Sequence, residues 1–349
     1  MSRRVTPAGV TYGVDVGGTK VLGVALADDG AVVAEHRVPT PFPASDDAPD
    51  GRTAAPGTGV ARAVVAVVAA LASDVARAGH ATARGLGLGV PGMVDADGRL
   101  RFSPHLTGAH DVDLQSLVAA RLAEAFGSPP GGAGALGVHA RNDANCAALA
   151  ELTFGAARGA TDVLVVTLGT GIGGALVLGG KVRSGAHGFA GEIGHMVVDP
   201  NGPPCPCGGR GCWERFASGG GLARLAREAA LAGTLTEAVR RAGGDPELVR
   251  GEHVTAAAAD GDPGARDVVE ELGWWLGLGL ANLVAVCDPE LVVVGGGLAR
   301  AGEMLLGPAR RALAALVEGG KARGEVPVVA ASLGPRAGAI GAALALWEG

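Results

Sequence analysis

The sequence predicts a two-domain α/β protein, and three observations lead to this prediction. The chain has 349 residues, more than one hydrophobic core usually supports. Apolar β-branched runs alternate with helical patterns along much of it. A strand, a glycine turn and a second strand occur twice, at 11–27 and at 163–178, and such an internal echo indicates two related halves. We therefore expect two α/β halves that face one another, with a binding site in the cleft.

The first half predicts a strand meander and then alternating strands and helices. Strands are expected at 11–16, 20–27, 31–38, 85–90 and 137–140, and helices at 60–78, 114–126 and 142–151. Residues 39–59 are rich in Pro, Asp, Gly and Ala without periodicity, which predicts an exposed loop. The Gly/Pro-rich stretch 128–134 is the candidate hinge.

The second half repeats the opening pattern, with strands expected at 163–167 and 175–178. The apolar run 272–287 spans 16 residues, short of the ~20 of a membrane helix, so a buried core helix is the better interpretation. A strand at 291–294 runs into Gly295-Gly296-Gly297 and a following helix. This is a third place where the backbone can approach a ligand closely.

Charge and cysteine content exclude several classes of protein. A net charge of −6 disfavours binding of nucleic acid through Lys and Arg against phosphates. The N-terminal segment reaches Asp15 without the apolar region of a signal peptide, so we expect a cytoplasmic protein that binds no membrane. Three of the five cysteines fall between positions 205 and 212. Without export, such clustering favours a metal site over disulfides.

The first candidate phosphate site is Asp15-Val-Gly17-Gly18-Thr19-Lys20. Paired glycines let backbone amides close on phosphate oxygens, Thr19 adds a hydroxyl donor, and Asp15 can hold a metal-bound water. The alternative interpretation is an ordinary hairpin turn with a solvated Lys20.

The second candidate phosphate site is Gly169-Thr170-Gly171-Ile-Gly173-Gly174. It also matches the G-x-G-x-x-G pattern of dinucleotide-binding folds, but those need a helix directly after the glycines. Here residues 175–180 predict a strand broken by a turn. A Walker A loop is also excluded, because neither glycine turn has the G-x-x-x-x-G-K-[ST] spacing.

Asn142 and Asp143 stand at the predicted start of a helix. Asn and Asp are preferred N-cap residues, and taken alone this explanation suffices. The same position keeps a carboxylate ionised through the positive helix end, and a sugar kinase needs an ionised base as the γ-phosphoryl group arrives. The two roles are compatible.

The most specific signal is Glu192-Ile-Gly-His195 followed by Cys205-Pro-Cys207-Gly-Gly-Arg-Gly-Cys212-Trp-Glu214. One imidazole and three thiolates form the Cys₃His set that suits tetrahedral Zn²⁺, and four protein ligands make the site structural. The alternative is a chance cluster of reduced cysteines. Glu192 and Glu214 flank the zinc ligands, so both carboxylates are candidates for hydrogen bonds to sugar hydroxyls.

Together these motifs resemble the ROK family of repressors, open reading frames and kinases, and within it the bacterial glucokinases. The resemblance runs over nearly the whole chain and includes Val90-Pro91-Gly92. It departs at Ala175, where many relatives have another glycine, and at the 39–59 loop, which is longer than usual.

The resemblance implies an actin-like (ribonuclease H-like) sugar kinase fold of two α/β domains around a central cleft. The domains are expected at 1–140 with 336–349, where 337–347 forms a returning helix, and at 141–335, which carries the zinc loop. It also implies ATP-dependent phosphorylation of glucose with Mg²⁺, one structural Zn²⁺, and a homo-oligomer, either dimer or tetramer.

The resemblance also assigns residue roles. Asp143 is the implied base, and His195 uses one ring nitrogen for zinc and offers the other to the sugar. The implied sugar-binding residues are Pro91, Gly92, Asn142, Asp143, Glu192, His195 and Glu214. The implied nucleotide-binding residues are Asp15, Gly17, Gly18, Thr19, Lys20, Thr167, Gly169, Thr170, Gly171, Gly173, Gly296 and Gly297. The implied zinc ligands are His195, Cys205, Cys207 and Cys212.

Several alternatives stay open. Fructose, mannose or an N-acetylated aminosugar can replace glucose in such a site, and polyphosphate can replace ATP. A sugar-sensing repressor is disfavoured because only eleven residues precede Tyr12, too few for a helix-turn-helix domain. A catalytically silent sugar sensor is disfavoured by Asp143 and the two phosphate motifs.

Overall fold

The computed structural model describes residues 9–41, 57–81, 83–103, 106, 110–127 and 136–347. Its contacts divide the chain into two compact units. Unit 1 consists of Met1–Arg158, Val182–Ala190 and Pro335–Gly349, and unit 2 consists of Gly159–Lys181 and Gly191–Gly334. The expected hinge at 128–134 lies outside the described residues, as does most of the 39–59 loop.

The boundary after Arg158 differs from the one expected after residue 140. The reason is helix α3 (Asp143–Phe154), which packs against α10 (Ala337–Leu344). The two backbones approach so closely that a Cβ at Gly341 would lie 1.6 Å from the carbonyl oxygen of Cys146. Asn142 and Asp143 therefore belong to unit 1.

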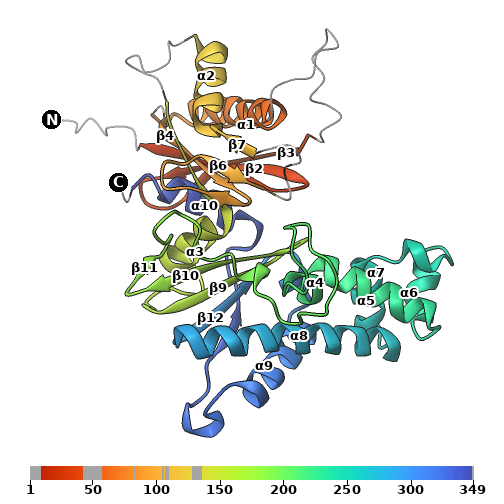
Figure 1. The fold of residues 1–349 in the computed structure, drawn as a ribbon. Helices are drawn as coiled ribbons and strands as arrows, with labels where there is room; N and C mark the ends of the chain where they lie inside the picture. The colour runs from red at the N-terminus through yellow and green to blue at the C-terminus, as the bar shows by residue number, and fades with distance from the viewer. Residues whose placement is uncertain are drawn as a thin grey trace. The chain divides into compact units, whose positions relative to one another are not determined.

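Unit 1 is built on a five-stranded sheet of order β3-β2-β1-β4-β8 (Figure 1). Its strands are β1 (Val10–Val16), β2 (Lys20–Ala27), β3 (Val32–Pro39), β4 (Ala83–Val90) and β8 (Gly137–Asn142). The first three form an antiparallel meander, and β4 runs parallel to both β1 and β8. A separate antiparallel sheet contains β5 (Met93–Val94), β6 (Leu100–Phe102) and β7 (His110–Val112).

Helices cover the main sheet of unit 1. They are α1 (Thr58–Arg77), α2 (Leu114–Phe126), α3 and α10, and a 3-10 turn, η6 (Gly334–Arg336), precedes α10. Asp113 caps α2 as expected, since its carboxylate accepts the Ser116 N–H at 3.0 Å. Glycines bring α10 against the sheet, because a Cβ at Gly13 or Gly87 would lie under 2 Å from its carbonyl oxygens.

Unit 2 is built on a second five-stranded sheet, of order β11-β10-β9-β12-β13. Its strands are β9 (Val163–Leu168), β10 (Ile172–Leu178), β11 (Lys181–Val182), β12 (Leu291–Gly295) and β13 (Val328–Ala330). The β9–β10 pair is antiparallel, and β12 runs parallel to β9 and β13. The pair β9–β10 thus repeats the pair β1–β2, which confirms the internal echo expected from the sequence.

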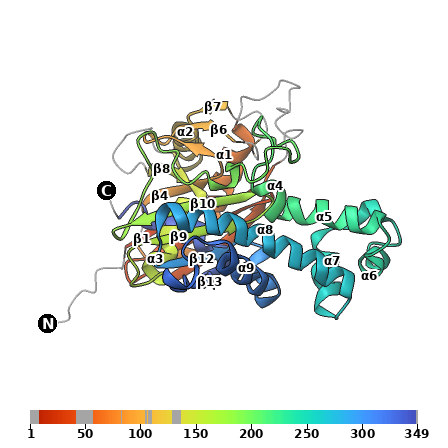
Figure 2. The ribbon, with the colours of Figure 1, turned by 60° about the horizontal axis from the view of Figure 1, so that its bottom comes forward.

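The helical part of unit 2 comes between β11 and β12 and after β12. The α-helices are α4 (Glu214–Ala217), α5 (Gly219–Leu231), α6 (Thr236–Arg241), α7 (Gly251–Ala259), α8 (Pro263–Cys287) and α9 (Glu303–Leu316). The 3-10 turns are η2 (Ile193–His195), η3 (Pro246–Leu248), η4 (Leu298–Ala301) and η5 (Gly320–Ala322). Helices α8 and α9 lie side by side (Figures 1 and 2), with Gly273 and Gly277 of α8 against α9.

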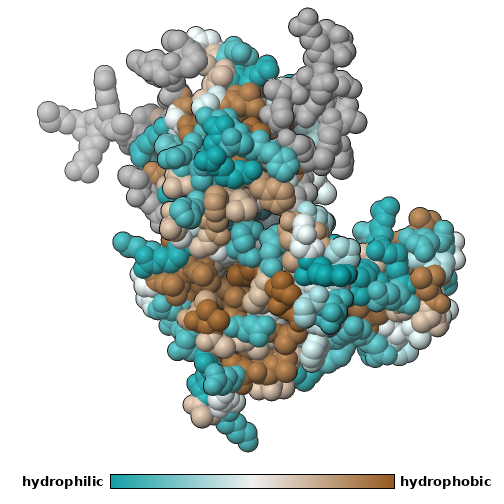
Figure 3. All heavy atoms as spheres, viewed as in Figure 1, coloured by the Kyte–Doolittle hydropathy of each residue, from teal (hydrophilic) through white to brown (hydrophobic). Residues whose placement is uncertain are grey.

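Among the described residues, two helices, α1 and α8, are long and apolar enough to cross a membrane by length and composition alone. Each contributes to a hydrophobic core: α1 packs Val64, Val67 and Leu71 into unit 1, and α8 packs Leu272 and Leu276 into unit 2. Packing therefore accounts for their apolar character, and residues 272–287 form part of a core helix as expected. Hydrophobic residues also gather on the face around β10 and α8, whereas α5–α7 present a mainly hydrophilic surface (Figure 3).

The contact between α10 and α3 predicts a large loss of stability for Gly341→Ala. The added methyl group meets backbone atoms of Cys146, which move less readily than side chains, so we expect a cost of at least ~1–3 kcal/mol. Thermal unfolding measures the effect. The matched control is Gly137→Ala on β8, where only a ring nitrogen of His139 lies within 4 Å, at 3.9 Å. Equal melting temperatures for the two variants would contradict the packing described here.

Candidate active site

The first glycine turn, Gly17-Gly18-Thr19, joins β1 to β2 as expected. The Gly17 N–H donates to the carbonyl oxygen of Lys20 at 2.9 Å, which closes the turn. Thr40 braces it from the end of β3, because the Thr40 N–H donates to the Thr19 carbonyl at 3.1 Å and its hydroxyl donates to the Gly17 carbonyl at 2.6 Å. Sequence reasoning missed Thr40, which it placed in an irregular loop.

Asp15 lies beside this turn, near the end of β1. Glycines make room for it: a Cβ at Gly338 would lie 2.6 Å from its carboxyl carbon, and one at Gly89 would lie 3.3 Å from its Oδ1. The pKa of the Asp15 carboxyl is raised to about 7, because burial and the Asp143 carboxylate raise it more than the Lys20 ammonium lowers it. Asp15 and Asp143 are thus close enough to interact.

Asn142 and Asp143 form the corner between β8 and α3. Asn142 caps α3, because its side-chain oxygen accepts the Asn145 N–H at 3.0 Å, and its amide donates to the Gly92 carbonyl at 3.1 Å. This second bond ties the corner to Pro91-Gly92, where Gly92 has φ 108°. Asp143 accepts the Ala144 N–H at 2.8 Å. The end of β4 and the start of α3 therefore form one polar edge in unit 1.

The second glycine turn is shorter than expected. It contains Gly169-Thr170-Gly171, closed by a 3.0 Å hydrogen bond from the Gly169 N–H to the Gly171 carbonyl. Gly173 does not belong to the turn but lies inside β10, opposite Thr167 of β9. Strand pairing begins at Ile172, so Gly173 and Gly174 are paired residues of strand β10 and not part of the turn.

The N-terminus of α5 holds this turn in place. The N–H groups of Gly219 and Gly220 donate to the carbonyls of Gly169 and Thr170, at 2.8 and 3.1 Å. Ser218 caps the helix by accepting the Gly221 N–H at 3.2 Å. The run Ser218-Gly219-Gly220-Gly221 was not used in the sequence interpretation, although a cap followed by three glycines was a readable signal.

A cavity of about 1140 Å³ opens beside this turn within unit 2. Gly169, Thr170, Gly219 and Gly220 line one part of it, and so does Gly297. The other lining residues were not predicted from the sequence. They are Leu168, Leu222, Ala223, Arg227, Glu247, Leu248, Val249, Arg250, Gly251, Glu252, Thr255, Ala256, Leu298, Arg300, Ala301 and Met304.

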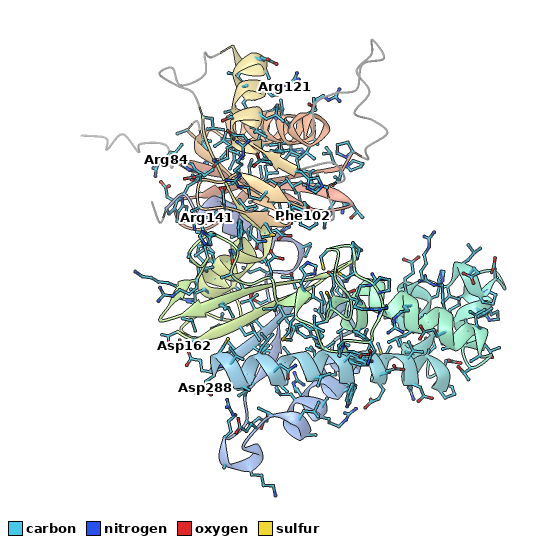
Figure 4. The ribbon with its side chains drawn as sticks, in the orientation of Figure 1. Arg84, Phe102, Arg121, Arg141, Asp162 and Asp288 are labelled. Carbon is cyan, nitrogen blue, oxygen red and sulfur yellow. The ribbon has the colours of Figure 1, made fainter. Side chains whose placement is uncertain are left out.

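The glycines after β12 lie near the same cavity. Gly296 has φ 85°, and a Cβ there would lie 2.4 Å from the Leu168 carbonyl oxygen. The 3-10 turn η4 follows these glycines in place of the expected helix, and α9 begins only at Glu303. Asp162 and Asp288 mark the opposite end of β9 and β12 (Figure 4). The glycines therefore stand at the carboxyl ends of parallel strands, where open α/β sheets bind ligands.

The four expected zinc ligands converge in unit 2. The ligand atoms of His195, Cys205, Cys207 and Cys212 all lie within 4.8 Å of one another. His195 Nδ1 is 3.7 Å from Cys205 Sγ, and Cys207 Sγ is 3.7 Å from Cys212 Sγ. A tetrahedral Zn²⁺ with ~2.3 Å bonds to sulfur separates its sulfur ligands by about 3.8 Å, so this donor set fits the ion.

Tight turns and one tryptophan shape the loop that carries these ligands. Gly208 and Gly211 have φ 94° and 69°, a backbone region that strains other residues. The Trp213 N–H donates to the Met196 carbonyl at 2.8 Å, which joins the His195 segment to the Cys212 segment. The Trp213 side chain is fully buried, and its indole N–H donates to the Trp275 carbonyl at 2.8 Å. The loop is therefore anchored to α8.

Two carboxylates flank His195, one at each ring nitrogen. Glu192 Oε2 lies 3.9 Å from Nε2, and Glu214 Oε1 lies 3.8 Å from Nδ1. Glu214 is buried and also accepts a hydrogen bond from the Cys205 thiol at 3.1 Å. Nδ1 faces the sulfur cluster, so Nε2 is the nitrogen left to contact a substrate.

Each unit thus gathers its own share of the expected site residues. Unit 1 holds Asp15, Gly17, Gly18, Thr19, Lys20, Pro91, Gly92, Asn142 and Asp143. Unit 2 holds Thr167, Gly169, Thr170, Gly171, Gly173, Glu192, His195, Cys205, Cys207, Cys212, Glu214, Gly296 and Gly297.

Known proteins are similar to this chain over nearly its whole length. Residues 11–348 match the model of the ROK family. The chain belongs to the ROK family. It is 37% identical over 340 residues to the glucokinase of Streptomyces coelicolor, which covers 96% of each protein.

Solved structures agree with this membership. A ROK family glucokinase from Streptomyces griseus, in complex with glucose and AMPPNP, matches with TM-score 0.83 and 35% identity over 98% of this chain and 100% of that one. A ROK hexokinase from Thermus thermophilus matches with TM-score 0.69 and 33% identity over 97% and 100%. The expected actin-like sugar kinase fold is confirmed.

The environment of Asp15 predicts a pH-dependent stability. A carboxyl whose pKa rises from 3.8 to about 7 on folding destabilises the folded protein once it must ionise, by at most about 4 kcal/mol. This penalty is absent below pH 3.8, grows with pH and is complete above about pH 7. We expect Asp15→Asn to raise the melting temperature at pH 8 more than at pH 5, in the absence of nucleotide and Mg²⁺. An equal gain at both pH values would contradict the raised pKa.

Proposed function

We propose that this protein is a glucokinase that transfers the γ-phosphoryl group of ATP to the 6-hydroxyl of glucose. The observation that carries the proposal is similarity to glucokinases over nearly the whole chain, combined with a His/Cys cluster flanked by two carboxylates. The product, glucose 6-phosphate, feeds glycolysis. The compact Cys₃His donor set also suits a reducing compartment, which supports a cytoplasmic location.

The nucleotide is assigned to the cavity in unit 2 and to the two glycine turns. A volume of about 1140 Å³ is ample for adenosine, since ligand pockets typically span ~300–1,000 Å³. Gly169–Gly171 and Gly297 supply close backbone approach for phosphate oxygens, as do Gly17 and Gly18 in the turn of unit 1. Gly296 supports the floor of the cavity through its contact with Leu168.

The sugar is assigned to Glu192, His195 and Glu214, together with Asn142 and the Pro91-Gly92 edge. Glu192 lies near the outward-facing Nε2 of His195, so carboxylate and imidazole can share one diol of the sugar. Such placed acceptors reject a sugar that lacks a matching hydroxyl, because a buried acceptor is then left unpaired.

Asp143 is assigned as the general base. Its carboxylate accepts the Ala144 N–H at the first turn of α3, and the positive end of that helix favours the ionised form. An ionised carboxylate takes the proton of the 6-hydroxyl as the oxygen attacks phosphorus. Asp15, beside the turn at Gly17-Gly18, is assigned to a water of the Mg²⁺ shell, where the ion neutralises phosphate charge when bound.

His195, Cys205, Cys207 and Cys212 are assigned to one structural Zn²⁺, which holds the loop together when bound. The spacing of their ligand atoms supports this assignment, and four protein ligands leave no open position for a catalytic water. The ion also fixes the tautomer of His195 by occupying Nδ1.

Self-association is proposed through the face that carries α8. Trp274 of α8 is 43% exposed and Val286 is 81% exposed, and large apolar side chains are enriched at interfaces. A homodimer or a tetramer is expected, with no role for nucleic acid or membrane.

A coupled assay over a panel of hexoses tests the proposal. Glucose, fructose, mannose and an N-acetylated aminosugar are each compared with ATP and with polyphosphate as donor. We expect the highest kcat/KM for glucose with ATP. A different preferred hexose or donor would overturn that part of the assignment, and absence of turnover with every pair would overturn the kinase assignment itself.

Asp143→Asn tests the base. The amide cannot accept the proton, so kcat should fall by about 10²–10⁴-fold or more, while glucose affinity changes little. Isothermal titration with glucose measures the affinity and the coupled assay measures turnover. Full turnover in this variant would refute the assignment.

Cys207→Ser tests the zinc assignment. Zinc coordination stabilises small peptide sites by ~10–16 kcal/mol, an upper guide for a loop in a large domain. We expect loss of bound zinc by elemental analysis and a large rise in the KM for glucose. The control is Cys287→Ser, a cysteine outside the cluster. Full glucose affinity in metal-stripped protein would contradict the assignment.

A further inference from the structure

Arg215 is a charged side chain that the site described so far does not use. It stands on α4, directly after Glu214 and three residues after the zinc-ligand candidate Cys212. The backbone there is held firmly, because the Arg215 N–H donates to the Cys212 carbonyl at 2.9 Å and its own carbonyl accepts from Arg224 Nε at 3.4 Å. Its position is therefore set by the zinc loop and by α5.

The direction of the Arg215 side chain follows from its neighbours. Trp213, Phe216 and Ala217 are buried in the core of unit 2, and their spacing places them on one helical face, so Arg215 leaves from another. Its Nη1 would lie 3.9 Å from a Cβ on Gly220, and that same Cβ would lie 3.2 Å from the Thr170 carbonyl oxygen. The guanidinium thus reaches the corner where the second glycine turn meets α5.

The hydrogen bonding of Arg215 is incomplete. Its Nε is buried and has no hydrogen-bond acceptor among the described residues. A buried guanidinium donor without an acceptor is costly, and one is usually retained where an anion binds. Arg224, from the same corner, is different: its guanidinium donates to both carboxylate oxygens of Glu228, at 2.8 and 2.9 Å.

We infer that Arg215 binds the terminal phosphates of the nucleotide at the Gly169–Gly171 turn. An arginine suits this task, because its planar donors match phosphate oxygens and its charge is permanent. Two consecutive residues of α4 would then contact the two substrates, Glu214 the sugar and Arg215 the phosphate. The inference rests on the proposed function for the identity of the anion.

Isothermal titration in the presence of Mg²⁺ tests the inference with three probes, namely adenosine, glucose and a non-hydrolysable ATP analogue. In Arg215→Gln we expect the affinity for the ATP analogue to fall by about 10- to 100-fold, the loss of a charge-assisted contact. Adenosine and glucose should bind within about twofold of wild type, because neither carries the phosphate. Arg215→Lys should recover part of the lost affinity by keeping the charge.

Arg311→Gln is the matched control, since its guanidinium is already paired with Glu270 in the same unit and is not among the residues that line the cavity, so its affinities should stay at the wild-type values. If Arg215→Gln lowered the affinities for adenosine, glucose and the analogue equally, Arg215 would only pack the loop and the inference would be wrong. An unchanged affinity for the analogue would also overturn the inference. Wild-type protein that binds the analogue but phosphorylates no hexose would overturn the proposed function alone, because the comparison of variants needs no turnover.

Discussion

The close approach of residues 191–195 to strand β10 is the constraint on which the rest of unit 2 depends. Three glycines permit it: a Cβ at Gly174 would lie 2.2 Å from Ile193, one at Gly191 would lie 2.5 Å from the Gly174 carbonyl, and one at Gly194 would lie 2.1 Å from the Ile172 carbonyl. The strand that leaves the glycine turn therefore supports the segment that presents Glu192 and His195. One piece of backbone therefore supports both the Gly169–Gly171 turn and the segment that carries Glu192 and His195.

Glycines in unit 1 also permit a close approach, but there they make room for the carboxyl group of Asp15 and not for a neighbouring strand. Gly89 and Gly338 leave space for the Asp15 carboxyl, and burial together with Asp143 raises its pKa to about 7. Burial and the nearby Asp143 carboxylate both disfavour ionisation of Asp15, whereas the Lys20 ammonium favours it. The glycines therefore hold Asp15 where its ionisation depends on the neighbouring charges.

The sequence was sufficient for features that are local in the chain. The turns at Gly17-Gly18 and Gly169–Gly171, the caps Asp113 and Asn142, and the clustered cysteines depend on neighbours a few residues away, so pattern and spacing predicted them. Features set by distant contacts were missed. Thr40 braces a turn twenty-three residues earlier, and the cavity is lined from four separate segments. The boundary after Arg158 depends on α10, almost two hundred residues beyond α3.

In the loop that carries His195 and the three clustered cysteines, different contacts anchor the loop to the core and position its ligand side chains. The loop has little regular structure, and its isolated bridges are Val197–Cys212 and Pro204–Arg210. Burial raises the pKa of the Cys205 and Cys212 thiols, so a cation beside them would favour their thiolate forms. Trp213, in contrast, anchors the loop to α8 without any ion. In the proposed zinc site, a bound ion would order the ligands and Glu214 around a tryptophan anchor that belongs to the core, while the α5–α7 helices keep their own buried side chains.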